Sequence, residues 1–187
     1  MRKFAVGVIA LSAIFSLTGC ATSTEANPTS TIDPALIPQS APANVVTVDA
    51  ANFDDGFGDT IFKVGEGPTW CTISPAWGED PASVTCEQDE ASVQYGAIPA
   101  PADCNASYGY QIRLWAGKDA VTAGNHKLAQ FTCATSSYSD PSDAKVLENG
   151  QQVTVGDITC FVVDVTARCD NKNKNYIVLG PQAWALG

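Results

Sequence analysis

The fold of this chain is decided by two stretches, TWCTISPAWGEDPASVTCEQ (residues 69–88) and ITCFVVDVTARCDN (residues 158–171). Each contains a strand-like run with a cysteine, a turn, and a second run that ends in a cysteine followed by an acidic residue. Adjacent antiparallel strands bring facing residues within ~4.5–5.5 Å of each other, a separation that a disulfide tolerates. The two stretches therefore predict two β-hairpins, each with a disulfide across its arms.

Seven cysteines are present, and six of them lie in the part of the chain that contains the hairpins. The predicted disulfides are Cys71–Cys86, Cys160–Cys169 and, by elimination, Cys104–Cys133. This is one choice among ~15 connectivities that six cysteines allow, and the sequence does not decide among them. A zinc or iron–sulfur site is disfavoured, because there is no Cys-x-x-Cys spacing and only one histidine. The cysteines thus indicate a disulfide framework in an oxidising compartment.

The rest of residues 44–187 also has the sequence pattern of a β protein. Short apolar or alternating runs, rich in Val, Ile, Thr, Tyr and Trp, are separated by turn residues, as in half-buried strands. The additional predicted strands are 45–48, 60–64, 110–117, 127–135, 151–155 and 175–180. One segment, DPSDAKVLENG (140–150), is also compatible with a short capped helical turn. The fold class that we predict is all-β, a small antiparallel sandwich or partly open barrel with three disulfides.

The first twenty residues predict a lipid anchor. Arg2 and Lys3 precede an apolar run, Phe4 to Leu17, which is shorter than the ~20 residues that a membrane-spanning helix needs. Its length and charge are typical of a secretory signal peptide. The run ends in LTGC (17–20), which resembles a bacterial lipobox, so Cys20 is the expected site of lipidation. The alternative is an ordinary secretory signal that is cut elsewhere.

The predicted domains are a signal peptide (1–19), a lipidated cysteine with a tether (20–43), and the β domain (44–187). The tether is rich in Ser, Thr, Ala and Pro, a composition that favours an extended chain. Removal of residues 1–19 takes away Arg2 and Lys3 and no acid, so the net charge changes from −10 to −12. Such a charge excludes nucleic acid as a plausible partner and gives no attraction to anionic lipid headgroups.

The order of elements resembles a cysteine-stapled domain of unknown function that is common in exported and lipid-anchored actinobacterial proteins. The matching phrases are Val84-Thr85-Cys86-Glu87, Cys104 before the Gly109–Gly117 strand, Phe131-Thr132-Cys133, Leu147-Glu148-Asn149-Gly150, and the hairpin Cys160 to Cys169-Asp170-Asn171. The resemblance covers roughly residues 60 to 180. It implies a location outside the cytoplasm and no particular activity.

Candidate chemical groups are few. His126 lies in a turn with no nucleophile motif to serve, and we interpret it as a loop histidine. Asp54, Asp55 and Asp59 in NFDDGFGD offer a second interpretation, a calcium loop, although their spacing does not match an EF-hand. No other cofactor is expected. We interpret the acidic residues of the first hairpin as charges on turns and strand ends; they are Glu79, Asp80, Glu87, Asp89 and Glu90.

Trp77 stands near the tip of the first hairpin and is a possible ligand contact, since an exposed aromatic ring can stack on a sugar or fill a partner's pocket. The alternative, which burial statistics favour, is that it folds back over the Cys71–Cys86 disulfide. Trp70, Trp115 and Trp184 lie in strand-like runs and are expected in the core.

Together these features predict a lipid-anchored cell-envelope protein on the outer face of the membrane. Its leading function is non-enzymatic binding of an envelope protein, glycan or lipid. Two alternatives are an envelope hydrolase that uses paired carboxylates, which twenty acidic residues permit, and a structural spacer.

Overall fold

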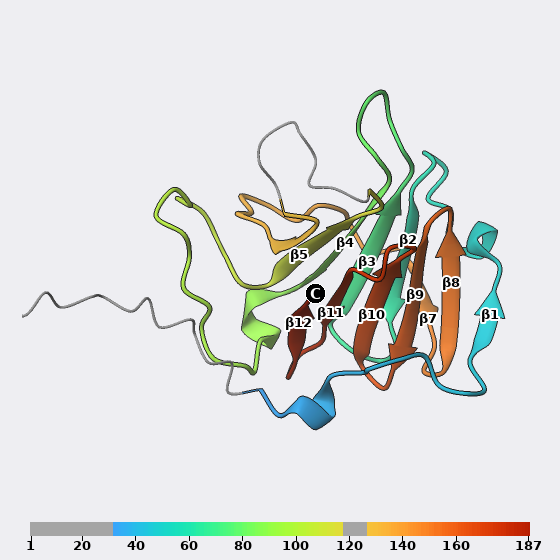
Figure 1. The fold of residues 1–187 in the computed structure, drawn as a ribbon, viewed down its shortest axis with the longest axis horizontal. Coiled ribbons are helices and arrows are strands. Elements are labelled where there is room, and N and C mark those ends of the chain that lie inside the picture. The colour runs from blue at the N-terminus through green and yellow to red at the C-terminus, as the bar shows by residue number, and fades with distance from the viewer. Residues whose placement is uncertain (1–31, 118–126) are drawn as a thin grey trace, which may run out of the picture.

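A computed structural model describes residues 32–117 and 127–187 as an all-β fold of two packed six-stranded sheets (Figure 1). Sheet A has the order β1 (Val46–Val48), β8 (Gln151–Val155), β9 (Ile158–Val163), β10 (Thr166–Asn171), β11 (Tyr176–Leu179) and β12 (Trp184–Leu186). Sheet B has the order β6 (Ala129–Phe131), β5 (Gln111–Trp115), β4 (Ser83–Gln88), β3 (Thr69–Ser74), β2 (Thr60–Val64) and β7 (Lys145–Leu147). The predicted fold class is confirmed.

Helical structure in the described residues is limited to three 3-10 turns. These are η1 (Pro34–Leu36), η2 (Ala50–Phe53) and η3 (Glu90–Ser92). Within 32–117 and 127–187, no helix has the length and apolar character needed to cross a bilayer.

The two sheets are built in the same way. Each consists of five antiparallel strands in chain order, β2 to β6 in sheet B and β8 to β12 in sheet A, with one parallel strand added at the edge. That edge strand comes from the other half of the chain: β1 precedes β2 but pairs with β8, and β7 precedes β8 but pairs with β2. The echo between the two cysteine hairpins is therefore part of a larger repeat, and the two halves are interlocked through their exchanged edge strands.

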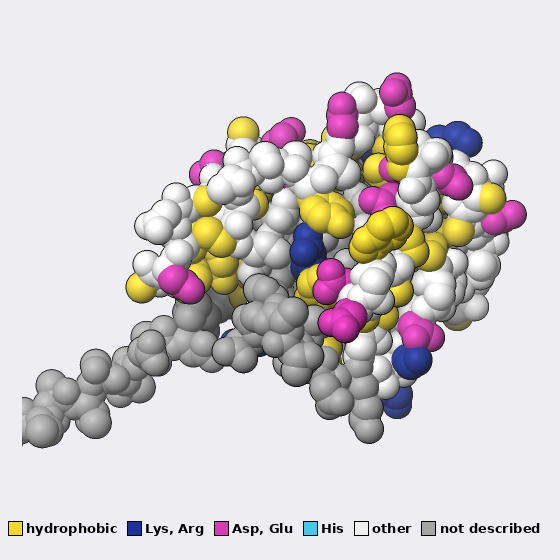
Figure 2. All heavy atoms as spheres, turned by 90° about the horizontal axis from the view of Figure 1, so that it is seen from above, with side chains coloured by type: hydrophobic (Ala, Val, Ile, Leu, Met, Phe, Trp, Pro, Cys, Tyr) yellow, Lys and Arg dark blue, Asp and Glu magenta, His cyan; other side chains and the backbone are white. Residues whose placement is uncertain are grey.

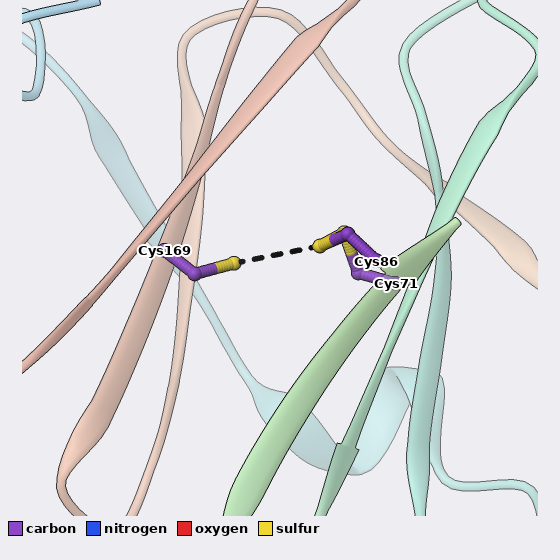
Figure 3. A group of neighbouring side chains, drawn as sticks. All are labelled: Cys71, Cys86 and Cys169. Atoms are coloured by element: carbon purple, nitrogen blue, oxygen red, sulfur yellow. Dashed lines mark hydrogen bonds between the residues drawn. A yellow bond between two sulfur atoms is a disulfide. The ribbon is translucent and has the colours of Figure 1, made fainter. Parts of the chain in front are cut away.

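The predicted disulfide connectivity is present. Cys71 lies opposite Cys86 on β3 and β4, Cys160 lies opposite Cys169 on β9 and β10, and both bonds are completely buried. They face each other across the two sheets, with 3.9 Å between the Sγ atoms of Cys86 and Cys169 (Figure 3). Since neither disulfide sulfur carries a hydrogen, this is a van der Waals contact at the centre of the core. The third bond joins Cys104 to Cys133.

The core surrounds this contact with apolar side chains from the inner faces of both sheets. Fully buried members are Phe62, Ile73, Val84, Ile112, Leu114, Leu147, Val153, Ile158, Ile177 and Leu179. Along β2 the pattern alternates strictly between buried and half-buried positions, as expected for a strand with one face in the core. Leu147 shows that β7, although only three residues long, contributes to the core.

Two expectations differ from the structure. Segment 140–150 holds strand β7, whereas the sequence was also compatible with a helical turn; tertiary pairing with β2 decides in favour of the strand. The sequence predicted a tether of extended conformation that ends at residue 43. From residue 32 onward, however, this segment runs along the lower end of sheet A to β1 (Figure 1). It includes the η1 turn, and the carbonyl of Pro38 accepts a hydrogen bond from Arg168 Nη1 at 3.0 Å.

Leu147→Ala tests the exchanged edge strand. Because Leu147 is fully buried, truncation should lower the free energy of unfolding by about 2–5 kcal/mol. Lys145→Ala on the same strand, at an exposed position, should stay within about 0.5 kcal/mol of the parent. Urea denaturation of both variants measures the difference, and equal stabilities would contradict the placement of β7 in the core.

Candidate functional site

The loops at the upper end of sheet B form the most distinctive surface of the described chain. Thr60 of β2 lies opposite Ile73 of β3, so the loop that leads into β2 (54–59) and the loop that follows β3 (75–82) leave the sheet at the same end. Figure 2 looks down on this end, where hydrophobic side chains lie among acidic ones. Phe57 and Trp77, 96% and 84% exposed, belong to these two loops.

Loop 54–59 is held in place by its own aspartates. Asp54 Oδ1 accepts a hydrogen bond from the amide of Gly56 at 2.6 Å. Asp55 Oδ1 accepts from the amides of Phe57 and Asp59 at 2.8 and 3.1 Å. Gly56 has a φ of 84°, a conformation that costs glycine little. The loop thus presents the ring of Phe57 to solvent from an ordered backbone, although burial would be the ordinary state of such a side chain.

A groove of about 540 Å³ lies beside this loop. Its other wall is segment 138–145, which precedes and begins β7, so the groove joins two parts of the chain that are far apart in sequence. Five aspartates line it, together with Phe57, Ile61 and Tyr138; the aspartates are Asp54, Asp55, Asp59, Asp140 and Asp143. Partial burial, and to a smaller extent the nearby Asp55 carboxylate, raise the pKa of Asp59 above its ordinary value of 3.8, against the opposing effect of a hydrogen bond with Ser74.

Segment 134–144, which we call the strap, crosses the outer face of sheet B and is fixed there by Glu87. This carboxylate is only 3% exposed. Its oxygens accept hydrogen bonds from the backbone amides of Tyr138 and Ser139 at 2.9 and 3.1 Å. They also accept from Trp70 Nε1 and Gln111 Nε2, each at 2.9 Å. Glu87 lies near the end of β4, as interpreted, but it is a buried charge. The backbone amides of the strap, with Trp70 and Gln111, supply the donors that a buried carboxylate needs.

Tyr138 connects the strap to both the groove and the sheet. Its hydroxyl lies 3.0 Å from Ser74 Oγ, and its ring lies 4.7 Å from the guanidinium carbon of Arg113. Arg113 Nε donates to Thr85 Oγ1 at 2.8 Å, and the same guanidinium lies 5.4 Å from the Trp115 ring. The side chain of Tyr138 is thereby held at the groove with 41% of its surface exposed.

Trp77 does not fold back over the Cys71–Cys86 disulfide. The backbones of Trp77 and Asp80 form two mutual hydrogen bonds of 3.0 Å, with Gly78 at a φ of 59° inside the turn. This tight turn ends the hairpin and directs the indole outward, so the interpretation favoured by burial statistics was wrong. Glu79 and Asp80 are exposed in the same turn, as expected. Trp70 is buried, but on the outer face beneath the strap, while Trp115 and Trp184 are half-buried.

A second groove, of about 880 Å³, lies over β5 and β6. It is lined by Arg113, Trp115 and Lys127 and by both cysteines of the outer disulfide. The Nε1 atom of Trp115 is buried without a hydrogen-bond partner. Its charged lining residues are Arg113, Lys127 and Asp103, whereas five aspartates and one lysine line the groove beside Phe57.

Two predicted residues, Cys20 and His126, lie outside the described residues. The calcium interpretation of Asp54, Asp55 and Asp59 gains no support from their geometry, because Asp54 and Asp55 are engaged in turn hydrogen bonds, and it remains a prediction. Within 32–117 and 127–187, the group of possible metal-ligand atoms that lie close together belongs to Cys71, Cys86 and Cys169. Their sulfurs are bonded in disulfides, and a metal needs thiolates.

The sequence reasoning missed Phe57, Tyr138 and Arg113. The Asp-Asp-Gly-Phe-Gly-Asp turn was a usable signal for Phe57, since Asp and Gly predict a tight turn that leaves a central aromatic residue outside. Comparison with protein families, with curated proteins and with solved structures gives no match for this chain.

Glu87→Gln tests the strap. The substitution keeps one acceptor oxygen but replaces the other by an amide that cannot accept the second set of donors, so the free energy of unfolding should fall by about 1.5–3 kcal/mol. Hydrogen exchange at the amides of Tyr138 and Ser139 should accelerate. The exposed Glu90→Gln is the matched control and should change neither quantity. Unchanged exchange at both amides in Glu87→Gln would show that Glu87 does not hold the strap.

Proposed function

We propose that this protein is a lipid-anchored, extracytoplasmic binding domain that recognises a Lys- or Arg-bearing segment of a cell-envelope protein. The observation that carries the proposal is the ring of Phe57, 96% exposed on an ordered turn at the mouth of an acidic groove. An apolar ring that a well-formed turn holds in solvent contributes nothing to the stability of the fold, and exposed aromatic rings are common at contact sites.

Charge determines which partner class the groove favours. Its lining carries five aspartates and one lysine, Lys145, and the chain has a net charge of −10. A cationic segment is attracted to such a field and its approach is accelerated, whereas an anionic polymer is repelled. Lysine and arginine also interact favourably with aromatic faces, which Phe57, Tyr138 and Trp77 offer at the same end of sheet B.

The anchor part of the proposal is supported by the sequence. The short apolar run and LTGC at 17–20 make Cys20 the acceptor of the acyl chains, and several chains together give a durable membrane attachment. Three disulfides are consistent with residence outside the cytoplasm. The cysteine-stapled actinobacterial domain that the sequence resembles supports the same location.

One observation favours the hydrolase alternative. Asp59 has a raised pKa and lies in a groove with other carboxylates, an arrangement that acid catalysis requires. Asp55, whose carboxylate contributes to this rise, already accepts two backbone hydrogen bonds through Oδ1, which suits a turn-forming role better than that of a nucleophile. We therefore place binding before hydrolysis.

Phe57→Ala tests the groove. A hexalysine peptide serves as the probe, and its affinity, measured by calorimetric titration, should fall at least fivefold in the variant, because the cation–π and apolar contacts are lost. Affinity for the parent should also fall steeply between 50 and 300 mM salt.

Leu36→Ala is the matched control for Phe57→Ala, since Leu36 is 40% exposed on η1 and lies away from the groove. It should leave the affinity unchanged. Binding of a neutral glycan in place of the peptide would contradict the basic-partner proposal, as would equal peptide affinities for the parent and Phe57→Ala.

Cys20→Ala tests the anchor. The variant should lose incorporation of a clickable fatty acid and should appear in the culture medium, because the thiol is the only acceptor that the lipobox provides. A variant that remains with the membrane fraction would contradict lipidation at Cys20.

A further inference from the structure

The three disulfides differ sharply in their access to solvent. All four cysteines of the central pair of bonds are 0% exposed: Cys71, Cys86, Cys160 and Cys169. Cys133, in contrast, is exposed, and its partner Cys104 is half-buried. Thiol–disulfide exchange requires a thiolate to reach a sulfur atom, so exposure is the first condition for reaction.

The surroundings of the outer bond provide room for an attacking group. Cys104 and Cys133 both line the groove over β5 and β6, and the neighbouring lining residues Pro101 and Asp103 are exposed. Lys127 and Asp103 line the same groove, so the charges around the bond are mixed and its access to solvent is what distinguishes it. The central bonds have no such approach, because two sheets cover them on both sides.

We infer that Cys104–Cys133 is a thiol–disulfide exchange site, with the dithiol of a Cys-x-x-Cys oxidoreductase outside the cytoplasm as its reaction partner, and that Cys133 is the sulfur attacked. This inference does not depend on the proposed binding function. It assigns to the outer bond a chemistry from which the two central bonds are excluded.

The reaction balances as a two-electron exchange. A thiolate of the oxidoreductase attacks Cys133 Sγ, forms a mixed disulfide and expels Cys104 as a thiolate, which takes up a proton. The second thiol of the oxidoreductase loses its proton and attacks the first oxidoreductase sulfur in the mixed disulfide. Cys133 is expelled as a thiolate and takes up a proton. The oxidoreductase leaves as a disulfide, and this protein retains two thiols. The reverse sequence forms the bond.

The consequence of reduction is local. Residues 99–103, at the tip of the long connection between β4 and β5, are all exposed, and the disulfide ties the end of this tip to the residues after β6. The first part of the connection is fixed independently, because Gln94 donates its amide to Pro181 O at 2.8 Å and Tyr95 OH donates to Gly109 O at 2.7 Å. Beside the disulfide, Ser107 and Ala134 exchange two backbone hydrogen bonds of 3.1 and 2.9 Å, so the two segments stay paired there after reduction. We therefore expect reduction to loosen only residues 99–103 and to leave both sheets folded.

Graded reduction of the native protein tests the difference in access. The chain is treated with increasing dithiothreitol without denaturant, alkylated, and mapped by mass spectrometry. Cys104 and Cys133 should be alkylated at a reductant concentration at least tenfold lower than the four central cysteines, with the near-ultraviolet circular dichroism retained. Alkylation of all six cysteines together, or alkylation of Cys104 and Cys133 only after the dichroism is lost, would overturn the inference.

Trapping identifies the attacked sulfur. Thioredoxin with its resolving cysteine replaced by serine is the probe, since it stops at the mixed disulfide. The adduct should map to Cys133 of the otherwise native chain. An adduct on Cys104 or on a central cysteine, or no adduct under the conditions that reduce the bond with dithiothreitol, would overturn the assignment. The double variant Cys104→Ser, Cys133→Ser should give no adduct.

Discussion

The contact between two disulfides at the centre of the molecule is the constraint on which the rest of the structure depends. Each bond fixes the register of one hairpin, because a slip by one residue would move its cysteine to the opposite face of the sheet. The 3.9 Å approach of Cys86 and Cys169 then aligns the two hairpins across the core. Within each sheet the two hairpin strands are joined covalently, and between the sheets the two buried disulfides are in van der Waals contact.

The register also decides what happens on the outer faces. In both hairpins an acidic residue follows the second cysteine and points away from the core: Glu87 after Cys86, and Asp170 after Cys169. Glu87 holds the strap that leads into β7. Asp170 binds Arg168, whose guanidinium donates to Pro38 of the segment that leads into β1 and lies 4.0 Å from the Tyr176 ring. Thus both acids help to hold the segment that precedes the parallel edge strand of their sheet, Glu87 directly and Asp170 through Arg168.

Local patterns in the sequence predicted most of the strands and the cysteine pairs of the two hairpins, but they did not predict β7 and left the full disulfide connectivity open. The run 60–64 is β2, 151–155 is β8, and the two hairpin cysteine pairs face each other as predicted. The exchange of β1 and β7 between halves was not predictable in this way, because three-residue edge strands carry little pattern and parallel pairing joins distant segments. The burial of Glu87 depends on the strap above it, and the groove depends on two loops that meet only in the fold. Trp77 was misplaced because average burial says nothing about a particular turn.

The position of residues 32–43 bears on how the acidic groove is oriented relative to the membrane. The described segment 32–43 passes along the lower end of sheet A, whereas loop 54–59 and the β3–β4 turn lie at the upper end (Figure 1). If Cys20 carries the anchor, the eleven residues between it and Ile32 span at most about 40 Å, so the domain stays close to the bilayer. Attachment at the lower end then favours orientations in which the acidic groove, with Phe57 and Trp77, faces away from the membrane.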